Sequence, residues 1–83
     1  MAKRLVWTDQ AKADIRAIDQ QPALQVLKTL ARFVKSGEGD TKQLRGYEPP
    51  LFRLRAQDYR VFFRAQGAAL EITRVLDRKE AYR

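Results

Sequence analysis

The chain has 83 residues, a formal net charge of +7 and neither cysteine nor histidine. Its length indicates one domain, and a hydrophobic content of 45% is enough to form a folded core. Without cysteine the chain can form no disulfide and offers no thiolate ligand or thiol nucleophile. Without histidine it also lacks the usual catalytic base, so any chemistry must use Arg, Lys, Tyr, Asp or Glu.

The positive charge favours a polyanionic partner, although solubility alone would also account for it. The excess of basic residues falls mainly after residue 41. The N-terminal residues contain no apolar run of signal-peptide length, and no stretch approaches the roughly 20 apolar residues of a membrane span. We therefore expect a cytoplasmic protein with no membrane contact, no metal and no cofactor.

The first half of the chain predicts a strand and two helices. Residues 3–7 are β-prone, and Thr8 or Asp9 then provides an N-cap for a helix. Pro22 suits the first turn of a second helix, which is expected to end at Gly37. Apolar residues recur at helical spacing in both segments and are expected to face the core: Ala11, Ile15 and Ile18, then Leu24, Leu27, Leu30, Ala31 and Val34.

The second half predicts a loop over residues 38–50 and then an antiparallel meander of three strands between residues 51 and 76. The expected architecture is α+β in the order β-α-α-β-β-β, with both helices packed on a small antiparallel sheet and a short C-terminal turn or helix. Alternation assigns one face of the sheet to the core: Phe52, Leu54, Val61, Phe63, Leu70 and Ile72. The opposite face then receives Arg53, Arg55, Arg60, Arg64 and Thr73.

The row of arginines on one face of the sheet has a cost, because like charges on neighbouring strands repel by up to about 1 kcal/mol per pair. Any single arginine is best explained as a long side chain extending into solvent. For four that converge, we favour a phosphate site, since guanidinium groups bind phosphate through paired hydrogen bonds. Aromatic rings at Tyr47, Phe62 or Tyr82 can stack on an exposed base, and single-stranded RNA needs both contacts.

Four short segments carry a family resemblance. They are Gln43-Leu44-Arg45-Gly46, Phe52-Arg53-Leu54-Arg55, Asp58-Tyr59-Arg60-Val61-Phe62-Phe63, and the terminal run from Arg74 to Arg83 with Arg78 and Tyr82. Their order resembles the Leu-Arg-Gly, Asp/Gly-Tyr-Arg-Val and Val-x-x-Arg…Tyr signatures of the RelE/ParE superfamily of bacterial type II toxins. The resemblance covers residues 1–83 as a single RelE-like toxin domain.

The resemblance implies the toxin half of a toxin–antitoxin pair, with a cognate antitoxin as partner and a possible hetero-oligomer with it. RelE-like members enter the ribosomal A site and cut mRNA without a metal, through attack of the ribose 2′-OH that leaves a 2′,3′-cyclic phosphate. ParE-like members instead inhibit DNA gyrase and have no nuclease activity. A plain nucleic-acid-binding domain is the third interpretation.

Matching the signatures position by position predicts the catalytic residues Arg53, Arg60, Arg78 and Tyr82. The expected RNA-binding residues are Lys42, Arg45, Arg55, Phe62, Arg64 and Lys79. The chain departs from the RelE pattern at Leu51, where RelE-type members can carry lysine, and at Arg53, where they can also carry lysine. These departures leave the general base open.

The expected roles follow from charge and pKa. Arg60 and Arg78 would stabilise the charge of a phosphorane-like transition state, and Arg78 would also assist the leaving 5′-oxygen. Tyr82 is the candidate base, because surrounding arginines favour its phenolate, although it could equally anchor the tail to the sheet. Replacing Arg60 or Arg78 by alanine is expected to leave stability unchanged or slightly higher, since repulsion falls.

Overall fold

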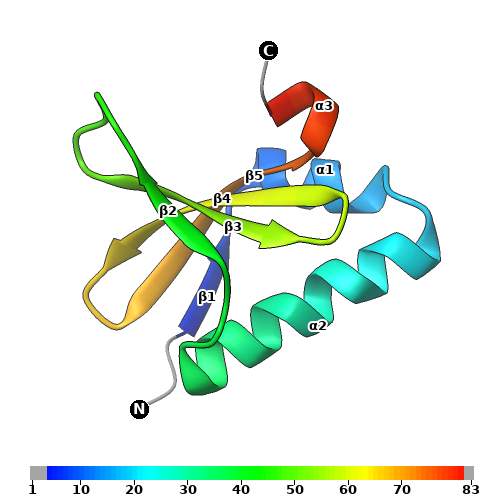
Figure 1. Ribbon diagram of the computed structural model, residues 1–83, viewed down its shortest axis with the longest axis horizontal. Helices are drawn as coiled ribbons and strands as arrows, with labels where there is room; N and C mark the ends of the chain where they lie inside the picture. Colours follow the sequence, from blue (N-terminus) through cyan, green and yellow to red (C-terminus); the bar gives the residue numbers. More distant parts are fainter. Residues whose placement is uncertain (1–3, 82–83) are drawn as a thin grey trace.

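The computed structural model describes residues 4–81, which form a five-stranded mixed sheet with two helices packed on it (Figure 1). The sheet has the order β1-β5-β4-β3-β2, with β1 parallel to β5 and the other neighbours antiparallel. The elements are β1 (Arg4–Trp7), α1 (Asp9–Arg16), α2 (Gln20–Ser36), β2 (Thr41–Leu44), β3 (Leu51–Ala56), β4 (Tyr59–Gln66), β5 (Ala69–Asp77) and α3 (Arg78–Ala81). The predicted α+β class, with a short C-terminal helix, is confirmed.

The helix boundaries lie where the sequence places them. The hydroxyl of Thr8 accepts a hydrogen bond from the Ala11 backbone N–H at 3.2 Å, which makes Thr8 the N-cap of α1. Gly37 ends α2 in the left-handed conformation, with φ of 78°, and its N–H donates to the Phe33 carbonyl at 2.8 Å.

The core lies between the helices and one face of β3, β4 and β5. Leu54, Val61, Phe63, Leu70 and Ile72 are buried there, as the alternation predicts, and Phe52 packs against them. The rings of Phe52 and Phe63 stack with centroids 5.5 Å apart. Phe33 of α2 meets Phe63 from the helix side at 5.4 Å, which fixes α2 over this face of the sheet.

Two expectations for the fold are wrong. Residues 41–44 form strand β2, although the sequence predicts a loop there; the strand is an exposed sheet edge and therefore has no buried face that would produce alternation. The sheet is also mixed rather than antiparallel, because β1 pairs in parallel with β5.

The apolar stripe predicted for α2 is wrong in part. Of its members, Leu30 is buried, whereas Leu24 and Leu27 are 43% and 41% exposed. Val26, Leu30 and Phe33 face the sheet instead. Both sets obey helical spacing, so only packing distinguishes them.

Within residues 4–81, no helix is long and apolar enough to cross a membrane.

Candidate nucleic-acid interface

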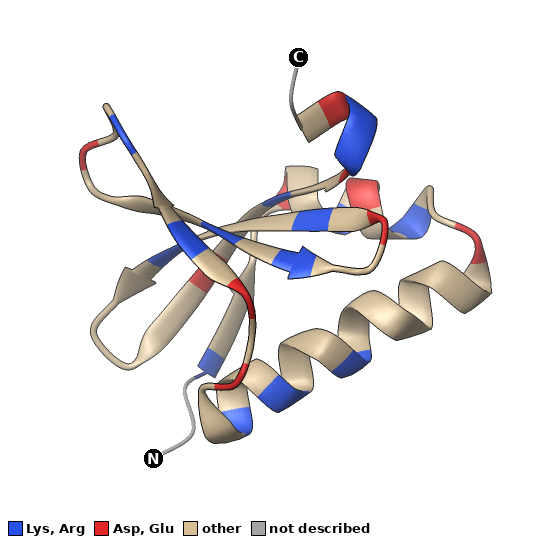
Figure 2. Cartoon of the chain, in the orientation of Figure 1, with Lys and Arg blue, Asp and Glu red and all other residues tan. Residues whose placement is uncertain are grey.

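Strand register brings the predicted cations together on the side of the sheet away from the helices. Arg55 of β3 lies directly opposite Arg60 of β4, and Arg53 lies opposite both Phe62 of β4 and Lys42 of β2. Opposite residues in an antiparallel pair point to the same face, with Cβ atoms about 5 Å apart. We call this surface the arginine face; it consists of Lys42, Arg53, Arg55, Arg60, Phe62 and Arg64. Figure 2 shows basic residues along β2, β3 and β4.

Arg60 is held by the fold more firmly than the sequence suggests. It is only 5% exposed, and its Nη1 donates to the carbonyls of Gln57 and Tyr59 at 2.8 and 2.9 Å. Gln57 belongs to the β3–β4 turn and Tyr59 is the first residue of β4, so the guanidinium connects the turn to the start of β4. The expectation that Arg60→Ala leaves stability unchanged is therefore replaced, since the substitution removes two hydrogen bonds made by a buried charged group.

The C-terminal helix starts at the same end of the sheet as Arg60. The backbone N–H of Arg78 donates to the Asp58 carbonyl at 2.8 Å, which ties α3 to the β3–β4 turn. The Asp77 carboxylate then accepts from the Lys79 backbone N–H at 2.9 Å and caps the helix. Arg78 and Lys79 are both exposed. Tyr82, the candidate base, lies outside the described residues.

Two predicted RNA-binding residues lie toward the other end of the sheet. Arg64 is four residues beyond Arg60 on β4, about 13 Å along the strand, and lies opposite Glu71. Its Nε donates to the Pro49 carbonyl at 3.4 Å, so it contacts the loop between β2 and β3. That loop contains exposed Arg45 and also Tyr47, which is 49% exposed, and it projects from the sheet (Figure 1). The cations thus line the length of the face rather than one spot.

The neighbours of the arginine face limit its positive charge. Leu51 is buried opposite Leu44, so an apolar pair and not a cation lies at this end of β2 and β3. Arg55 borders a polar hollow of about 370 Å³ whose lining also includes Arg32 and the acidic residues Glu38 and Asp40.

An ion pair that sequence reasoning missed removes one further cation from the face. A β-bulge at Phe62 and Phe63 puts Arg74 opposite Phe62, while the Thr73 hydroxyl donates to the Phe62 carbonyl at 3.1 Å. The Arg74 guanidinium nevertheless binds the Asp14 carboxylate of α1, with Nε–Oδ2 at 2.8 Å. The two residues are 60 positions apart in the sequence, so no local pattern indicates the pair.

The Asp14 carboxylate is the centre of this link. It also accepts from the Val75 backbone N–H at 2.9 Å and from the Gln10 side chain at 3.0 Å. Burial raises the pKa of Asp14, but hydrogen bonds from Arg74, Val75 and Gln10 outweigh it, and the net pKa is lowered. Asp14 therefore stays ionised and fixes α1 to β5.

Tyr59 is the tyrosine next to Arg60, and its environment opposes ionisation. Burial raises its pKa, and the carboxylates of Asp77, Asp19 and Asp58 raise it further. Its phenol is therefore protonated at neutral pH and is a poor substitute for Tyr82 as a base.

Comparison with known proteins relates this arrangement to a toxin family. A family model described as the ParE toxin of the type II toxin–antitoxin system parDE matches residues 5–82. No curated protein sequence matches the chain.

Solved structures share the fold at low sequence identity. The chain resembles the toxin–antitoxin complex RelBE2 from Mycobacterium tuberculosis, with TM-score 0.81, 19% identity and coverage of 93% of this chain and 99% of that chain. It also resembles the RelB–RelE antitoxin–toxin complex from Methanococcus jannaschii, with TM-score 0.74, 20% identity and coverage of 93% and 94%. The YoeB dimer from Staphylococcus aureus gives TM-score 0.70 at 13% identity and covers 89% and 94%.

Proposed function

The chain belongs to the ParE toxin family of type II toxin–antitoxin systems, and from this premise we propose that it arrests growth as a ribosome-dependent mRNA endonuclease in the cytoplasm. Its partners in this proposal are a cognate antitoxin in the resting cell, and mRNA in the ribosomal A site once the toxin is released. The proposed reaction needs no metal, because the ribose 2′-OH of the mRNA itself attacks the neighbouring phosphorus.

The direct pairing of Arg55 and Arg60 across β3 and β4 is the observation that supports this proposal. Two arginines whose Cβ atoms lie about 5 Å apart concentrate positive charge at this end of the arginine face. A phosphate that binds the exposed side chain of Arg55 through paired hydrogen bonds would also lie close to the buried charge of Arg60. Arg53 and Lys42 extend the same row toward β2, so that neighbouring phosphates of one strand can bind along it.

The proposed roles of the cations follow from how the fold holds them. Arg60 is fixed by the carbonyls of Gln57 and Tyr59 before RNA arrives, and a preorganised cation stabilises transition-state charge at no reorganisation cost. Arg78 is exposed at the same end of the sheet and is proposed to assist the leaving 5′-oxygen. Tyr82 remains the proposed base that takes the proton from the 2′-OH. Arg45, Arg64, Phe62 and Lys79 are proposed to bind flanking nucleotides.

Inhibition of DNA gyrase without nuclease activity is the second candidate function. It is favoured by the family model, whose description names ParE, and by the apolar Leu51 at a position where RelE-type members can carry lysine. In that case the fold is a binding module and Tyr82 has no part in proton transfer.

Mapping of mRNA 5′ ends in cells that express the chain distinguishes the two functions. The nuclease produces cuts in phase with codons inside translated regions, and these cuts disappear when translation initiation is blocked. Intact mRNA together with trapped gyrase–DNA cleavage complexes would refute the nuclease and support the gyrase inhibitor.

A further inference from the structure

A polar hollow opens at the end of β3, where β2 no longer runs beside it. Strand β2 begins at Thr41, which pairs with Leu54, so Arg55 lies beyond the last pair of these two strands. The Arg55 backbone N–H donates instead to the Asp40 carbonyl at 2.9 Å, just before β2 starts. The hollow has a volume of about 370 Å³, and its lining includes Thr29, Arg32, Glu38, Asp40, Arg55 and Gln57.

The segment between α2 and β2 forms one wall of the hollow and is held in place by the fold. The Glu38 backbone N–H donates to the Ser36 hydroxyl at 3.3 Å, and the Asp40 carbonyl accepts the bond from β3. Between them, Gly39 lies so close to the core that a Cβ atom there would come within 2.8 Å of Leu54 Cδ1. Because Leu54 is fully buried, it cannot move aside without disturbing the packing. The two carboxylates of this wall are therefore attached to a backbone whose position is set before any ligand binds.

Charged side chains of both signs share the hollow without neutralising one another. It contains two guanidinium groups and two carboxylates, from Arg32, Arg55, Glu38 and Asp40. Within residues 4–81, these four side chains form no ion pair with one another. The carboxylates repel a phosphate, which disfavours the RNA backbone inside the hollow. The lining therefore suits an uncharged group that both donates and accepts hydrogen bonds.

Guanine is the nucleic-acid base whose edges match these groups. Its N1–H and its N2 amino group are adjacent donors, which a carboxylate accepts through paired hydrogen bonds, and its O6 and N7 atoms accept from a guanidinium. Adenine, cytosine and uracil each place an acceptor beside the donor on the same edge, so a carboxylate there meets a lone pair. Carboxylates in this position therefore favour guanine and disfavour the other bases.

Arg55 connects the hollow to the arginine face. It lies opposite Arg60 on that face, and it also lines the hollow. A phosphate on Arg55 therefore brings the adjoining base of the same strand to the mouth of the hollow. Arg32 comes from α2 and is not part of the arginine face, so its guanidinium is left for the O6 and N7 atoms of the base.

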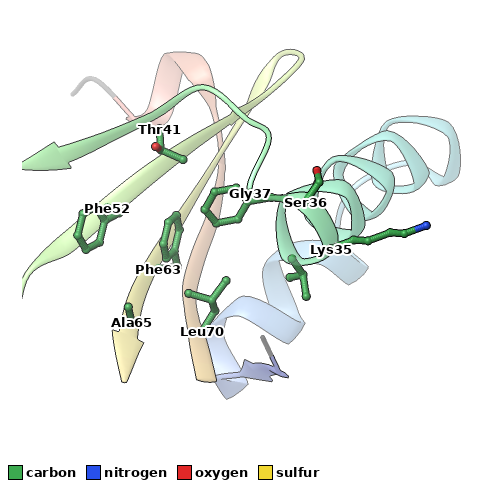
Figure 3. A pocket seen from close by; sticks show the side chains of 10 residues that line it. Lys35, Ser36, Gly37, Thr41, Phe52, Phe63, Ala65 and Leu70 are labelled. Atoms are coloured by element: carbon green, nitrogen blue, oxygen red, sulfur yellow. The ribbon is translucent and has the colours of Figure 1, made fainter. Parts of the chain in front are cut away.

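The larger groove beside the C-terminal end of α2 does not offer this chemistry. Phe52, Phe63 and Leu70 of the sheet line it (Figure 3), and these side chains have no group that pairs with the polar edge of a base. Moving such an edge from water onto apolar side chains costs free energy. The hollow beside Arg55 is therefore the better site for a base.

We propose that the hollow beside Arg55 binds an unstacked guanine of the RNA strand. The carboxylates of Glu38 and Asp40 accept from its N1–H and N2 amino group, and Arg32 donates to O6 and N7. This inference rests on the proposed function, because it needs an RNA strand on the arginine face, and it names the base that the toxin reads. It does not depend on cleavage, so it can fail while the nuclease stands.

Fluorescence anisotropy measures the base preference without cleavage. The full chain is titrated into labelled 2′-O-methyl oligouridines, in which the attacking 2′-OH is blocked, with one central guanosine, adenosine or inosine. We expect the guanosine strand to bind about tenfold more tightly than the adenosine strand, and the inosine strand, which lacks the N2 amino group, to lie between them. Equal affinity for the three strands, or a preference for adenosine, would overturn the guanine site. Codon-phased cuts in the mRNA mapping would still support the nuclease in that case.

Removal of the two carboxylates tests whether the hollow is the source of the preference. The double variant Glu38→Gln/Asp40→Asn should bind every strand more tightly, because repulsion is lost, yet its preference for guanosine over adenosine should fall to about twofold or less. Guanosine and inosine strands should then bind alike. The matched control Asp9→Asn/Asp19→Asn removes the same charge at exposed sites outside the hollow and should keep the full preference. All four side chains are exposed, so melting temperatures should stay within a few degrees. An undiminished preference in the first variant would contradict the proposal.

Discussion

Arg60 and Arg78 lie at the same end of the sheet, but the fold holds them in different ways. The Arg60 guanidinium is buried and donates to the carbonyls of Gln57 and Tyr59, whereas Arg78 is exposed and only its backbone N–H is tied to the turn. Arginine therefore contributes to stability as well as to the proposed site at position 60, and to the proposed site alone at position 78.

This difference predicts a separation between stability and toxicity. Arg60→Ala should lower the free energy of unfolding by about 2 kcal/mol, because the carbonyls of Gln57 and Tyr59 lose a hydrogen bond from a buried charged donor. In a domain of this size that loss lowers the melting temperature by roughly 10 °C. Arg78→Ala should change stability by less than about 0.5 kcal/mol and still abolish growth arrest.

Thermal unfolding and growth assays on the same variants check this separation. Lys12→Ala, an exposed cation on α1, serves as the control and should leave both stability and toxicity intact. A stable but fully toxic Arg78→Ala variant would remove Arg78 from the proposed site.

Strand alternation predicts that Arg53, Arg55 and Arg60 share one face, and the register agrees. It does not predict the bulge at Phe62 and Phe63 that puts Arg74 opposite Phe62. It does not predict the burial of Arg60, since an arginine at an alternating position is ordinarily exposed. That burial depends on where the carbonyls of Gln57 and Tyr59 point after the turn closes.

At the scale of elements, α2 shows why helical periodicity leaves a choice. Two apolar sets share the helix, and either could face the core by spacing alone. The rings of Phe33 and Phe63 meet at 5.4 Å and select the set that includes Val26 and Leu30. The sequence did not predict strand β2, because an exposed edge strand needs no buried residues at alternate positions.

The hydrogen bonds from Arg74 and Val75 of β5 to the Asp14 carboxylate of α1 make the free energy of unfolding depend on pH. The folded-state pKa of Asp14 is lowered, so the stability it contributes is present above the unfolded-state pKa of about 3.9 and is lost as pH falls through the folded-state value. Asp14→Asn should lower the free energy of unfolding by about 1–2 kcal/mol at pH 7, because it removes the negative charge that binds Arg74.

Melting curves from pH 7 to pH 2 test this link. The difference between the natural chain and Asp14→Asn should shrink below about pH 4, where the carboxyl becomes protonated. Asp40→Asn, at an exposed carboxylate, should track the natural chain throughout. A constant difference down to pH 2 would show that Asp14 acts through packing and not through its charge.

At the scale of the whole molecule, the net charge of +7 should make the proposed binding of RNA depend on the salt concentration. If four phosphates bind the arginine face, the logarithm of the affinity for single-stranded RNA should fall with the logarithm of salt concentration at a slope of about −3. Removing one contact by Arg55→Ala should make the slope less steep by about 0.7.

Fluorescence anisotropy of a labelled RNA oligonucleotide between 50 and 300 mM salt, on the order of the ionic strength in cells, measures both slopes. A slope near zero for the natural chain would mean that phosphate contacts do not drive binding. An unaltered slope in Arg55→Ala would exclude Arg55 from the contacts.

The parallel pairing of β1 with β5 also determines when the chain can complete its sheet during synthesis. The Thr8 hydroxyl donates a hydrogen bond to the Ile72 carbonyl across 64 residues of sequence, so β1 cannot pair with β5 until residues 69–72 have been synthesised. Contacts of such long range slow folding, and a nascent chain still inside the exit tunnel cannot close its sheet. The growing polypeptide therefore lacks the complete five-stranded sheet until its fifth strand has left the ribosome.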